Sequence, residues 1–192
     1  MDNLLPIGQF DVTQALLQLR QHPELWDQFN ERTVNPTSPH REVSDIWVRA
    51  RDRKDLGDDW NEYVGEMYDS VWYPAADALP AVKDLCFSLM TAVRGEKLGI
   101  VLITRVPPGG GVKPHTDFGY NAEQFEKYVI QLESHPEQGF YFAEGGYSAV
   151  PGEVYWFRNT VEHWVENNSP VDRISLIVSI MKERRMVCPQ PQ

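Results

Sequence analysis

The chain has 192 residues, 42% of them apolar, with six Trp, eight Tyr and eight Phe. This length allows one sizeable hydrophobic core but not two, and the composition is that of a folded protein rather than a disordered one. The net charge of -10 argues against general binding to nucleic acids or anionic membranes, because such binding needs clustered Lys and Arg.

The sequence also indicates a compartment. The first residues contain no basic stretch followed by an apolar run, so we expect no signal peptide. No segment approaches the roughly 20 apolar residues that span a bilayer. The two cysteines, Cys86 in an apolar stretch and Cys188 near the end, do not form a disulfide framework. We therefore expect a cytoplasmic protein with no nucleic-acid or membrane partner; the composition does not indicate an oligomeric state.

Two helices and a short strand are predicted in the first half of the chain. Residues 11–21 read as a short amphipathic helix. Apolar residues recur at steps of three and four from Leu79 to Val93, which predicts a second helix that ends before Gly95. Between them, residues 46–48 are a candidate strand, and residues 51–59 read as a highly charged turn that faces water.

After Gly95 the pattern changes to short β-rich runs separated by Pro, Gly and Asn turns. Helices followed by regular short strands predict an α+β, mainly β protein with a jelly-roll core. We expect a single domain, with a helical flanking region at 1–95, a jelly-roll core at 96–181 and a tail at 182–192. The predicted strands are residues 98–106, 128–132, 140–143, 154–157, 161–167 and 171–181.

Three residues form a candidate metal site. His115 and Asp117 are two apart, so an extended backbone places both side chains on one face, and His163 lies in another candidate strand. Two imidazoles and one carboxylate are the facial ligand set of non-haem iron(II) oxygenases. Each element alone is weak, since His-x-Asp occurs by chance and His163 could be a core histidine beside Trp164. The combination, in this order, favours a metal site.

An arginine follows the last metal-ligand candidate. Arg173 and Ser175 share one face of a predicted strand, and the other face is apolar. An arginine that faces a cavity needs a partner, because an unpaired buried charge is costly. A carboxylate held in bidentate fashion, with help from the serine hydroxyl, is the natural partner, so we expect a co-substrate carboxylate here. The alternative is a surface ion pair with Asp172 or Glu166.

Two blocks of the sequence resemble a known family. Residues 102–117, LITRVPPGGGVKPHTD, and residues 162–177, EHWVENNSPVDRISLI, are similar to the motifs of the aspartyl/asparaginyl β-hydroxylase family. This family belongs to the 2-oxoglutarate- and iron(II)-dependent oxygenases, and its other branches include bacterial hydroxylases of free amino acids. The resemblance covers residues 98–181 and implies a double-stranded β-helix, the jelly roll of the cupins.

The resemblance implies a role for each matching residue. His115, Asp117 and His163 would bind Fe(II), and Arg173, helped by Ser175, would bind 2-oxoglutarate. Thr104 matches a position that offers a hydroxyl to this co-substrate, and Tyr128 is a looser candidate. Dioxygen would complete the reaction. Residues 118–127 depart from the family pattern, and residues 128–131 offer none of the basic side chains found there in some members.

The implied function is hydroxylation of an amino acid, or of an Asp/Asn-type side chain in a peptide or protein. The substrate would therefore be a small molecule or a peptide. Arg105 and Arg158 are either candidates for binding its carboxylate or surface residues of their strands. Tyr141, Phe142, Tyr155, Trp156 and Trp164 could supply an apolar wall around the metal, although for most of them a place in the sandwich core is the favoured interpretation.

Two other functions are compatible with the ligand set. One is a cupin-fold isomerase or hydrolase that uses zinc or manganese, and the other is a non-catalytic metal-binding module. The first leaves Arg173 and Ser175 without a role, and the second has no need for an open metal face.

Overall fold

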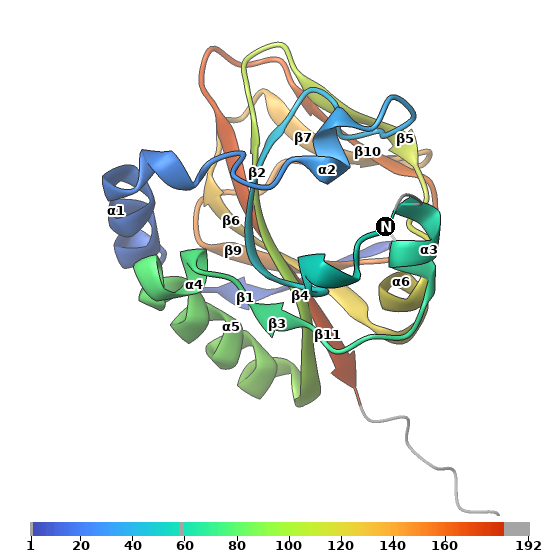
Figure 1. Ribbon diagram of the computed structural model, residues 1–192. Coiled ribbons are helices and arrows are strands. Elements are labelled where there is room, and N and C mark those ends of the chain that lie inside the picture. The colour runs from blue at the N-terminus through green and yellow to red at the C-terminus, as the bar shows by residue number, and fades with distance from the viewer. Residues whose placement is uncertain (1, 58–59, 183–192) are drawn as a thin grey trace, which may run out of the picture.

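Two antiparallel β-sheets form the core of the computed structural model, which describes residues 2–57 and 60–182 (Figure 1). The larger sheet has seven strands in the order β1-β9-β6-β11-β4-β2-β3, and the smaller has four in the order β5-β10-β7-β8. A cluster of buried residues contributed by strands of both sheets, including Val129, Phe140 and Phe157, fills the space between them. The fold is a jelly roll, as the sequence predicts.

The strands have the following bounds. The larger sheet contains β1 (Leu4–Gln9), β2 (Ser44–Ala50), β3 (Val71–Trp72), β4 (Gly95–Val106), β6 (Glu126–Glu133), β9 (Glu153–Phe157) and β11 (Arg173–Lys182). The smaller sheet contains β5 (Gly111–His115), β7 (Gln138–Phe142), β8 (Gly145–Tyr147) and β10 (His163–Asn167).

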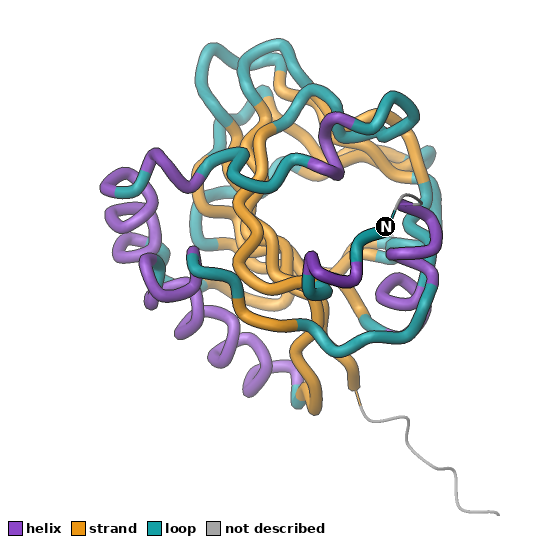
Figure 2. The backbone as a smooth tube through the Cα atoms, viewed as in Figure 1, coloured by secondary structure: helices purple, strands orange, loops and turns teal. Residues whose placement is uncertain are grey.

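Three helices cover the outer face of the larger sheet: α1 (Thr13–Gln21), α4 (Ala75–Ala78) and α5 (Pro80–Val93) (Figures 1 and 2). Strand β11 shows why they pack there. Its residues Leu176 and Val178 are fully buried in one cluster with Leu79 and Leu89 from the helical side. The alternate residues, beginning with Arg173, point to the space between the sheets.

The remaining helices are short. They are α2 (Glu31–Val34), α3 (Trp60–Gly65), α6 (Tyr120–Gln124) and two 3₁₀ turns, Pro23–Leu25 and Arg53–Asp55. In Figure 1, α2, α3 and α6 lie on the opposite side of the barrel from α1 and α5. No helix in the described part of the chain is long and apolar enough to cross a membrane.

The two predicted helices are present, and the second ends before Gly95 as expected. Arg94, with φ 56°, takes the left-handed conformation that closes α5, rather than the glycine that follows it. Gly95 is needed for another reason. A Cβ at this position would lie 2.2 Å from Ile180 Cγ2 on the paired strand β11, so a side chain there cannot be accommodated without a shift.

The first 95 residues contribute more than helices. Strands β1, β2 and β3 join the larger sheet, and β1 pairs with β9 along the edge. Strand β1 was not predicted from the sequence. Most of its residues are exposed and it contains Pro6, so it lacks the apolar alternation of a half-buried strand. Strands β5 and β8 lie in glycine-containing stretches that read as turns. The predicted tail, with Cys188, lies outside the described residues apart from residue 182.

The predicted charged turn at 51–59 is only partly exposed. Its first residue, Arg51, is 9% exposed, whereas Arg53, Lys54 and Asp55 face water. Arg51 is buried because its guanidinium lies over the rings of Tyr63 and Tyr68 and donates to the Tyr63 carbonyl. Residues 58 and 59 of this turn lie outside the described part of the chain.

Candidate metal centre and adjoining cavities

The structure brings His115, Asp117 and His163 together. One ligand atom from each lies within 4.8 Å of the other two. His115 ends β5 and His163 begins β10, and the two are register partners with ring centroids 4.4 Å apart. Asp117 follows β5, and its backbone N–H donates to the Asn159 carbonyl at 2.9 Å. Strand pairing and one loop hydrogen bond therefore position this metal triad.

Both histidines present the same nitrogen to the shared space. Nδ1 of His115 lies 2.8 Å from the Lys113 carbonyl oxygen, and Nδ1 of His163 lies 2.8 Å from that of Val161. Because a carbonyl only accepts, each Nδ1 carries the proton and each Nε2 keeps a free lone pair. Burial lowers the pKa of His163 to about 4, so its imidazole is neutral near pH 7, which is the form that binds metals.

Asp117 is ionised and paired with Lys127. Burial raises the pKa of the Asp117 carboxyl, but the nearby charge of Lys127 outweighs burial and holds the pKa far below its usual range. Lys127 Nζ donates to Asp117 Oδ2 at 2.7 Å. The sequence reasoning missed Lys127, which comes immediately before the stretch 128–131 that offers no basic side chain.

Arg173 is the buried cation of the site. It is 6% exposed, and its guanidinium donates to the hydroxyl oxygens of Ser175 at 2.7 Å and Tyr155 at 3.1 Å. Within residues 2–57 and 60–182, no carboxylate lies in ion-pair range of this guanidinium. The surface ion pair with Asp172 or Glu166 is therefore not formed. The positive charge is buried and hydrogen-bonded but not neutralised by the described part of the chain.

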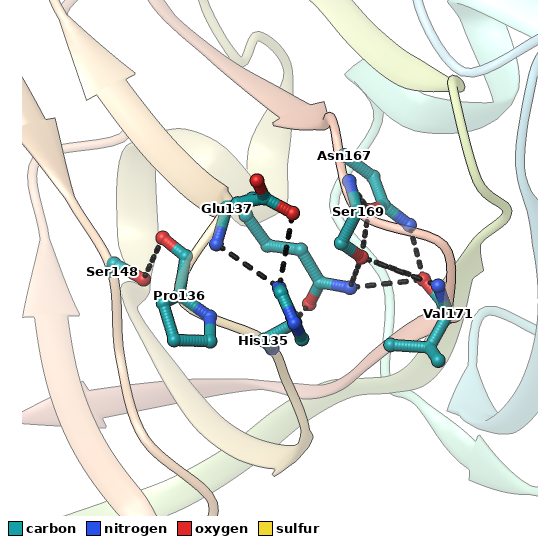
Figure 3. A network of polar contacts seen from close by, with 8 residues as sticks. His135, Pro136, Glu137, Ser148, Asn167, Ser169 and Val171 are labelled. Carbon is teal, nitrogen blue, oxygen red and sulfur yellow. Dashed lines mark hydrogen bonds and ion pairs between the residues drawn. The ribbon is translucent and has the colours of Figure 1, made fainter.

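The turn between β10 and β11 fixes the start of the strand that carries Arg173 (Figure 3). Asn167 donates through Nδ2 to the Val171 carbonyl at 2.8 Å and accepts from the Ser169 hydroxyl at 2.7 Å. Gln138 on β7 donates to the Ser169 hydroxyl at 2.7 Å and to the Val171 carbonyl at 3.0 Å. This closed polar network sets where β11 begins, and so where Arg173 points.

The metal triad and Arg173 line one space, the deep cavity. Its polar lining also includes Lys127 and Ser175. The aromatic wall consists of Phe140, Tyr155 and Phe157, so only Tyr155 comes from the predicted set. Its other lining residues are Arg32, His40, Thr104, Val106, Val112, Val129, Val165 and Ile177.

The other aromatic candidates lie elsewhere. Tyr141 and Trp164 stack on each other with ring centroids 5.7 Å apart, and neither lines the deep cavity. Phe142 is buried among the residues between the sheets, and Trp156 packs against the helix-side core. On β7 and β9, Phe140, Tyr155 and Phe157 point to the space between the sheets, whereas Tyr141 and Trp156 alternate with them and point to the opposite faces.

A second space, the outer cavity, adjoins the metal triad from the other side. It has a volume of about 290 Å³ and shares His115, Asp117 and Lys127 with the deep cavity. Its wall comes largely from the first half of the chain. Among the residues that line it are Arg32, Ser38, His40, Trp47, Arg51, Tyr63, Tyr68, Ile100, Leu102 and Asn121. Two of the candidate metal ligands, His115 and Asp117, therefore lie where the two cavities meet, and His163 lines the deep cavity.

His40 is a part of this junction that sequence reasoning did not assign. Its ring packs edge-on against His115 with centroids 4.9 Å apart. Burial first, and then the charge of Arg32, hold the pKa of His40 well below its ordinary value, so the ring is neutral. The Pro39 carbonyl accepts from the Lys113 N–H at 3.0 Å, which ties this segment to β5.

The family described as aspartyl/asparaginyl β-hydroxylase matches residues 19–183. The chain belongs to this family. A comparison with curated proteins finds no match. The metal triad, Arg173 and every strand except β1 fall within the matched residues, so the aspartyl/asparaginyl β-hydroxylase match covers most of the fold and the whole site.

Solved structures that resemble this family member include three prolyl hydroxylases. One from Trichoplax adhaerens, in complex with a hypoxia-inducible-factor peptide fragment, is 12% identical with a TM-score of 0.61, covering 99% of this chain and 89% of its own. A prolyl-4-hydroxylase from Pseudomonas putida is 18% identical with a TM-score of 0.51, and the match covers 94% of this chain and 93% of the hydroxylase. A collagen prolyl hydroxylase of Paramecium bursaria Chlorella virus-1, a 2-oxoglutarate complex, is 10% identical with a TM-score of 0.52, covering 95% and 97%. At these identities the likeness establishes the fold.

Two residues that the family resemblance assigns to the co-substrate have other partners. Thr104 lines the deep cavity, but its hydroxyl donates to Asp45 Oδ1 at 2.8 Å. Tyr128 does not line this cavity. It is fully buried in the helix-side core, where its hydroxyl donates to Glu126, because on β6 its side chain points opposite to those of Lys127 and Val129.

The two arginines predicted to meet a substrate carboxylate lie in neither cavity. Arg105 lies over the ring of Trp26, 4.5 Å from its centroid, in a groove beside α1. Arg158 is exposed. On β4, Arg105 points opposite to Thr104, which explains why one is outside and the other faces the deep cavity.

Proposed function

We propose that this protein is a 2-oxoglutarate- and iron(II)-dependent dioxygenase that hydroxylates an amino acid, or an Asp/Asn-type side chain of a peptide or protein. One observation carries the proposal. Arg173, a buried guanidinium with no carboxylate partner in the described part of the chain, opens into the same cavity as the metal triad. Membership of the hydroxylase family supports it.

The residues present fit an iron(II) ion. Two Nε2 lone pairs and one ionised carboxylate are directed at a common point, and the two imidazoles have their Nδ1 protons engaged behind them. When bound, iron(II) supplies the activation of dioxygen that is coupled to oxidation of 2-oxoglutarate to succinate and carbon dioxide. His115, Asp117 and His163 would hold it.

Other residues position the co-substrate and protect the reaction. A dicarboxylate in the deep cavity would place its far carboxylate on Arg173, beside the hydroxyls of Ser175 and Tyr155. Gln131 accepts from Ser175 at 3.2 Å and so orients that hydroxyl. Phe140 and Phe157 exclude water from the space next to the metal triad. The substrate would enter from the outer cavity.

The two alternatives explain less. An isomerase or hydrolase of the cupin type uses the metal triad but has no need for a buried guanidinium in the same cavity. A non-catalytic module has no need for either cavity to meet an open metal face.

The test is anaerobic titration of the purified protein with iron(II) and 2-oxoglutarate. The proposal expects a weak visible charge-transfer band that needs both components, and succinate release once air and a substrate are added. A zinc-dependent enzyme or an inert module gives no band. Panels of free amino acids and of peptides, compared for their stimulation of succinate release, then separate the two substrate classes. Absence of the band with iron bound would contradict the proposal.

A further inference from the structure

We propose that Arg32 binds a carboxylate of the substrate where the deep and outer cavities meet. The inference rests on the proposed function and names the group that selects the substrate. Arg32 belongs to the short helix α2, far in sequence from the metal triad, and lines both cavities. It was not among the residues predicted to bind a substrate.

Asp45 and Thr104 fix the guanidinium of Arg32 through hydrogen bonds from two of its nitrogens. Its Nε donates to Asp45 Oδ2 and its Nη2 to Asp45 Oδ1, both at 2.8 Å, and Nη2 also donates to the Thr104 hydroxyl at 3.2 Å. Asp45 is only 1% exposed, and the backbone N–H of Asp45 donates to the Asp27 carboxylate at 3.0 Å. This frame fixes the plane and direction of the guanidinium.

Two N–H groups of Arg32 remain available. A guanidinium has five N–H donors, and Asp45 and Thr104 account for the one on Nε and the two on Nη2. Nη1 has no hydrogen-bond partner among residues 2–57 and 60–182. Asp45 contacts the edge of the guanidinium formed by Nε and Nη2, and Asp45 lines neither cavity. Nη1 therefore lies on the edge of the guanidinium away from Asp45. An arginine fixed in this way is preorganised for one end of a carboxylate.

The other cations at the cavities have different positions or roles. Arg51 lines the outer cavity but not the deep one, and it donates to the Tyr63 carbonyl at 2.6 Å and to Glu66 at 2.9 Å. Lys127 donates to Asp117 of the metal triad, and Arg173 is assigned to the co-substrate. Among the described lining residues, Arg32 is therefore the cation that lines both cavities and contacts neither the metal triad nor the co-substrate site.

The donors at the cavities favour an anionic group. Asp45 offsets the charge of Arg32, Glu66 that of Arg51 and Asp117 that of Lys127, so among the described lining residues Arg173 is the cation without an ion-pair partner. What Arg32 offers is a pair of directed N–H donors on a fixed guanidinium, which suit a carboxylate better than an amide or amine. If 2-oxoglutarate binds Arg173, the donors on Nη1 of Arg32 stay free for a carboxylate of the substrate.

The outer cavity limits the size of what binds. About 290 Å³ is at the lower end of the range for small-molecule pockets. A free amino acid, or one side chain of a peptide, suits this space. The shared chemistry is a carboxylate close to the carbon that is hydroxylated, supplied either by the main chain of a free amino acid or by an Asp side chain.

The first test uses the unmodified protein with iron(II) and 2-oxoglutarate. Succinate release is measured with free L-amino acids and their amides, and with terminally blocked peptides that differ only as Asp or Asn. We expect the carboxylate member of a pair to act at roughly 10- to 100-fold lower concentration, because hydrogen bonds to charged groups contribute about 1.5–3 kcal/mol. A preference among the free amino acids identifies a main-chain carboxylate as the group bound, and a preference among the blocked peptides identifies an Asp side chain. Equal response to acid and amide in both arms overturns the proposal.

The second test changes Arg32. Arg32→Lys keeps a cation beside buried Asp45 but removes the Nη1 donors, so the KM for the most active probe should rise roughly 10-fold or more. The dissociation constant of 2-oxoglutarate, measured anaerobically, should change less than about twofold if the deep cavity is intact. Arg32→Gln combined with Asp45→Asn removes both charges without leaving one unpaired, and should raise the same KM.

Controls keep the two proposals separate. Arg105→Lys changes another arginine that is near the sheet but outside both cavities, and should leave the KM unchanged. An unchanged KM in both Arg32 variants, or a loss confined to 2-oxoglutarate affinity, overturns the assignment of Arg32 while the proposed function stands. Failure of the unmodified protein to bind 2-oxoglutarate with iron(II) would instead remove the proposed function itself.

Discussion

His115 and His163 are held by the same kind of hydrogen bond, each from Nδ1 to the carbonyl oxygen two residues earlier in the chain, at 2.8 Å in both cases. The two residues are partners across β5 and β10, so the pairing of these strands brings the two rings together, with centroids 4.4 Å apart. The backbone of the smaller sheet thus prepares two Nε2 atoms for a metal before any ion is bound.

His163→Gln should abolish tight binding of iron(II). Glutamine fills much of the same volume, so the packing against Phe140 and Phe157 is largely kept. Loss of a supporting partner alone weakens metal sites by 10- to 100-fold, so loss of a ligand should cost roughly 100-fold or more. Anaerobic calorimetry measures the affinity. The control is His135→Gln, which changes a histidine outside the metal triad; equal affinity in both variants would show that His163 is not a ligand.

Arg173→Met should remove 2-oxoglutarate binding without lowering the stability of the ligand-free protein. The guanidinium is buried with hydroxyl partners and no carboxylate in the described residues, so methionine replaces a costly charge by an apolar side chain. In the unmodified protein, 2-oxoglutarate at 100 times its dissociation constant should add about 2.7 kcal/mol to the free energy of unfolding. Thermal unfolding with and without 2-oxoglutarate measures both effects. A variant that 2-oxoglutarate still stabilises would contradict the role of Arg173.

Lys127→Met should destabilise the metal-free protein more than the metal-loaded one. Removing one member of a fully buried ion pair costs about 3–5 kcal/mol; this partly buried pair should lose less, but Asp117 still keeps an uncompensated charge. A divalent metal supplies that missing positive charge, so added metal should recover part of the loss. Urea unfolding in the presence of a chelator and then with added manganese makes the comparison, with Lys127→Arg as the charge-preserving control. If Lys127→Met lowered the free energy of unfolding equally with chelator and with manganese, Lys127 would not act by compensating the charge of Asp117.

Cys86 should react with thiol reagents only when the protein unfolds. Burial raises the pKa of its thiol from 9.0 to about 12, and the side chain is fully buried in the helix-side core. Because the folded pKa is the higher one, the stability linked to the neutral thiol is complete below pH 9 and is lost as the pH rises towards 12. A Cys188→Ser background isolates Cys86, and a colorimetric reagent at pH 8.5, with and without urea, measures its reaction. Rapid labelling of the native protein would show an accessible thiol and refute this prediction.

Local patterns in the sequence were enough to identify the strand that carries Arg173. Its alternation predicts that Arg173 and Ser175 face a cavity while Leu176 and Val178 pack outward, and the structure has this arrangement. Tyr128 was suggested by the family resemblance alone, without regard to which face of β6 it occupies, and it lies in the helix-side core. Its neighbour Lys127 reaches the metal triad instead.

The three candidate metal ligands could be found from spacing and order, because each residue type is chemically distinctive and lies in or beside a strand. Arg32, His40 and Arg51 could not be named in this way. They come from the first 95 residues, and they reach the cavities only because β2 pairs with β4 and the segment before it contacts β5. Pairing between segments far apart in the sequence leaves no local periodic signal, so side chains that depend on it become visible only in the folded chain.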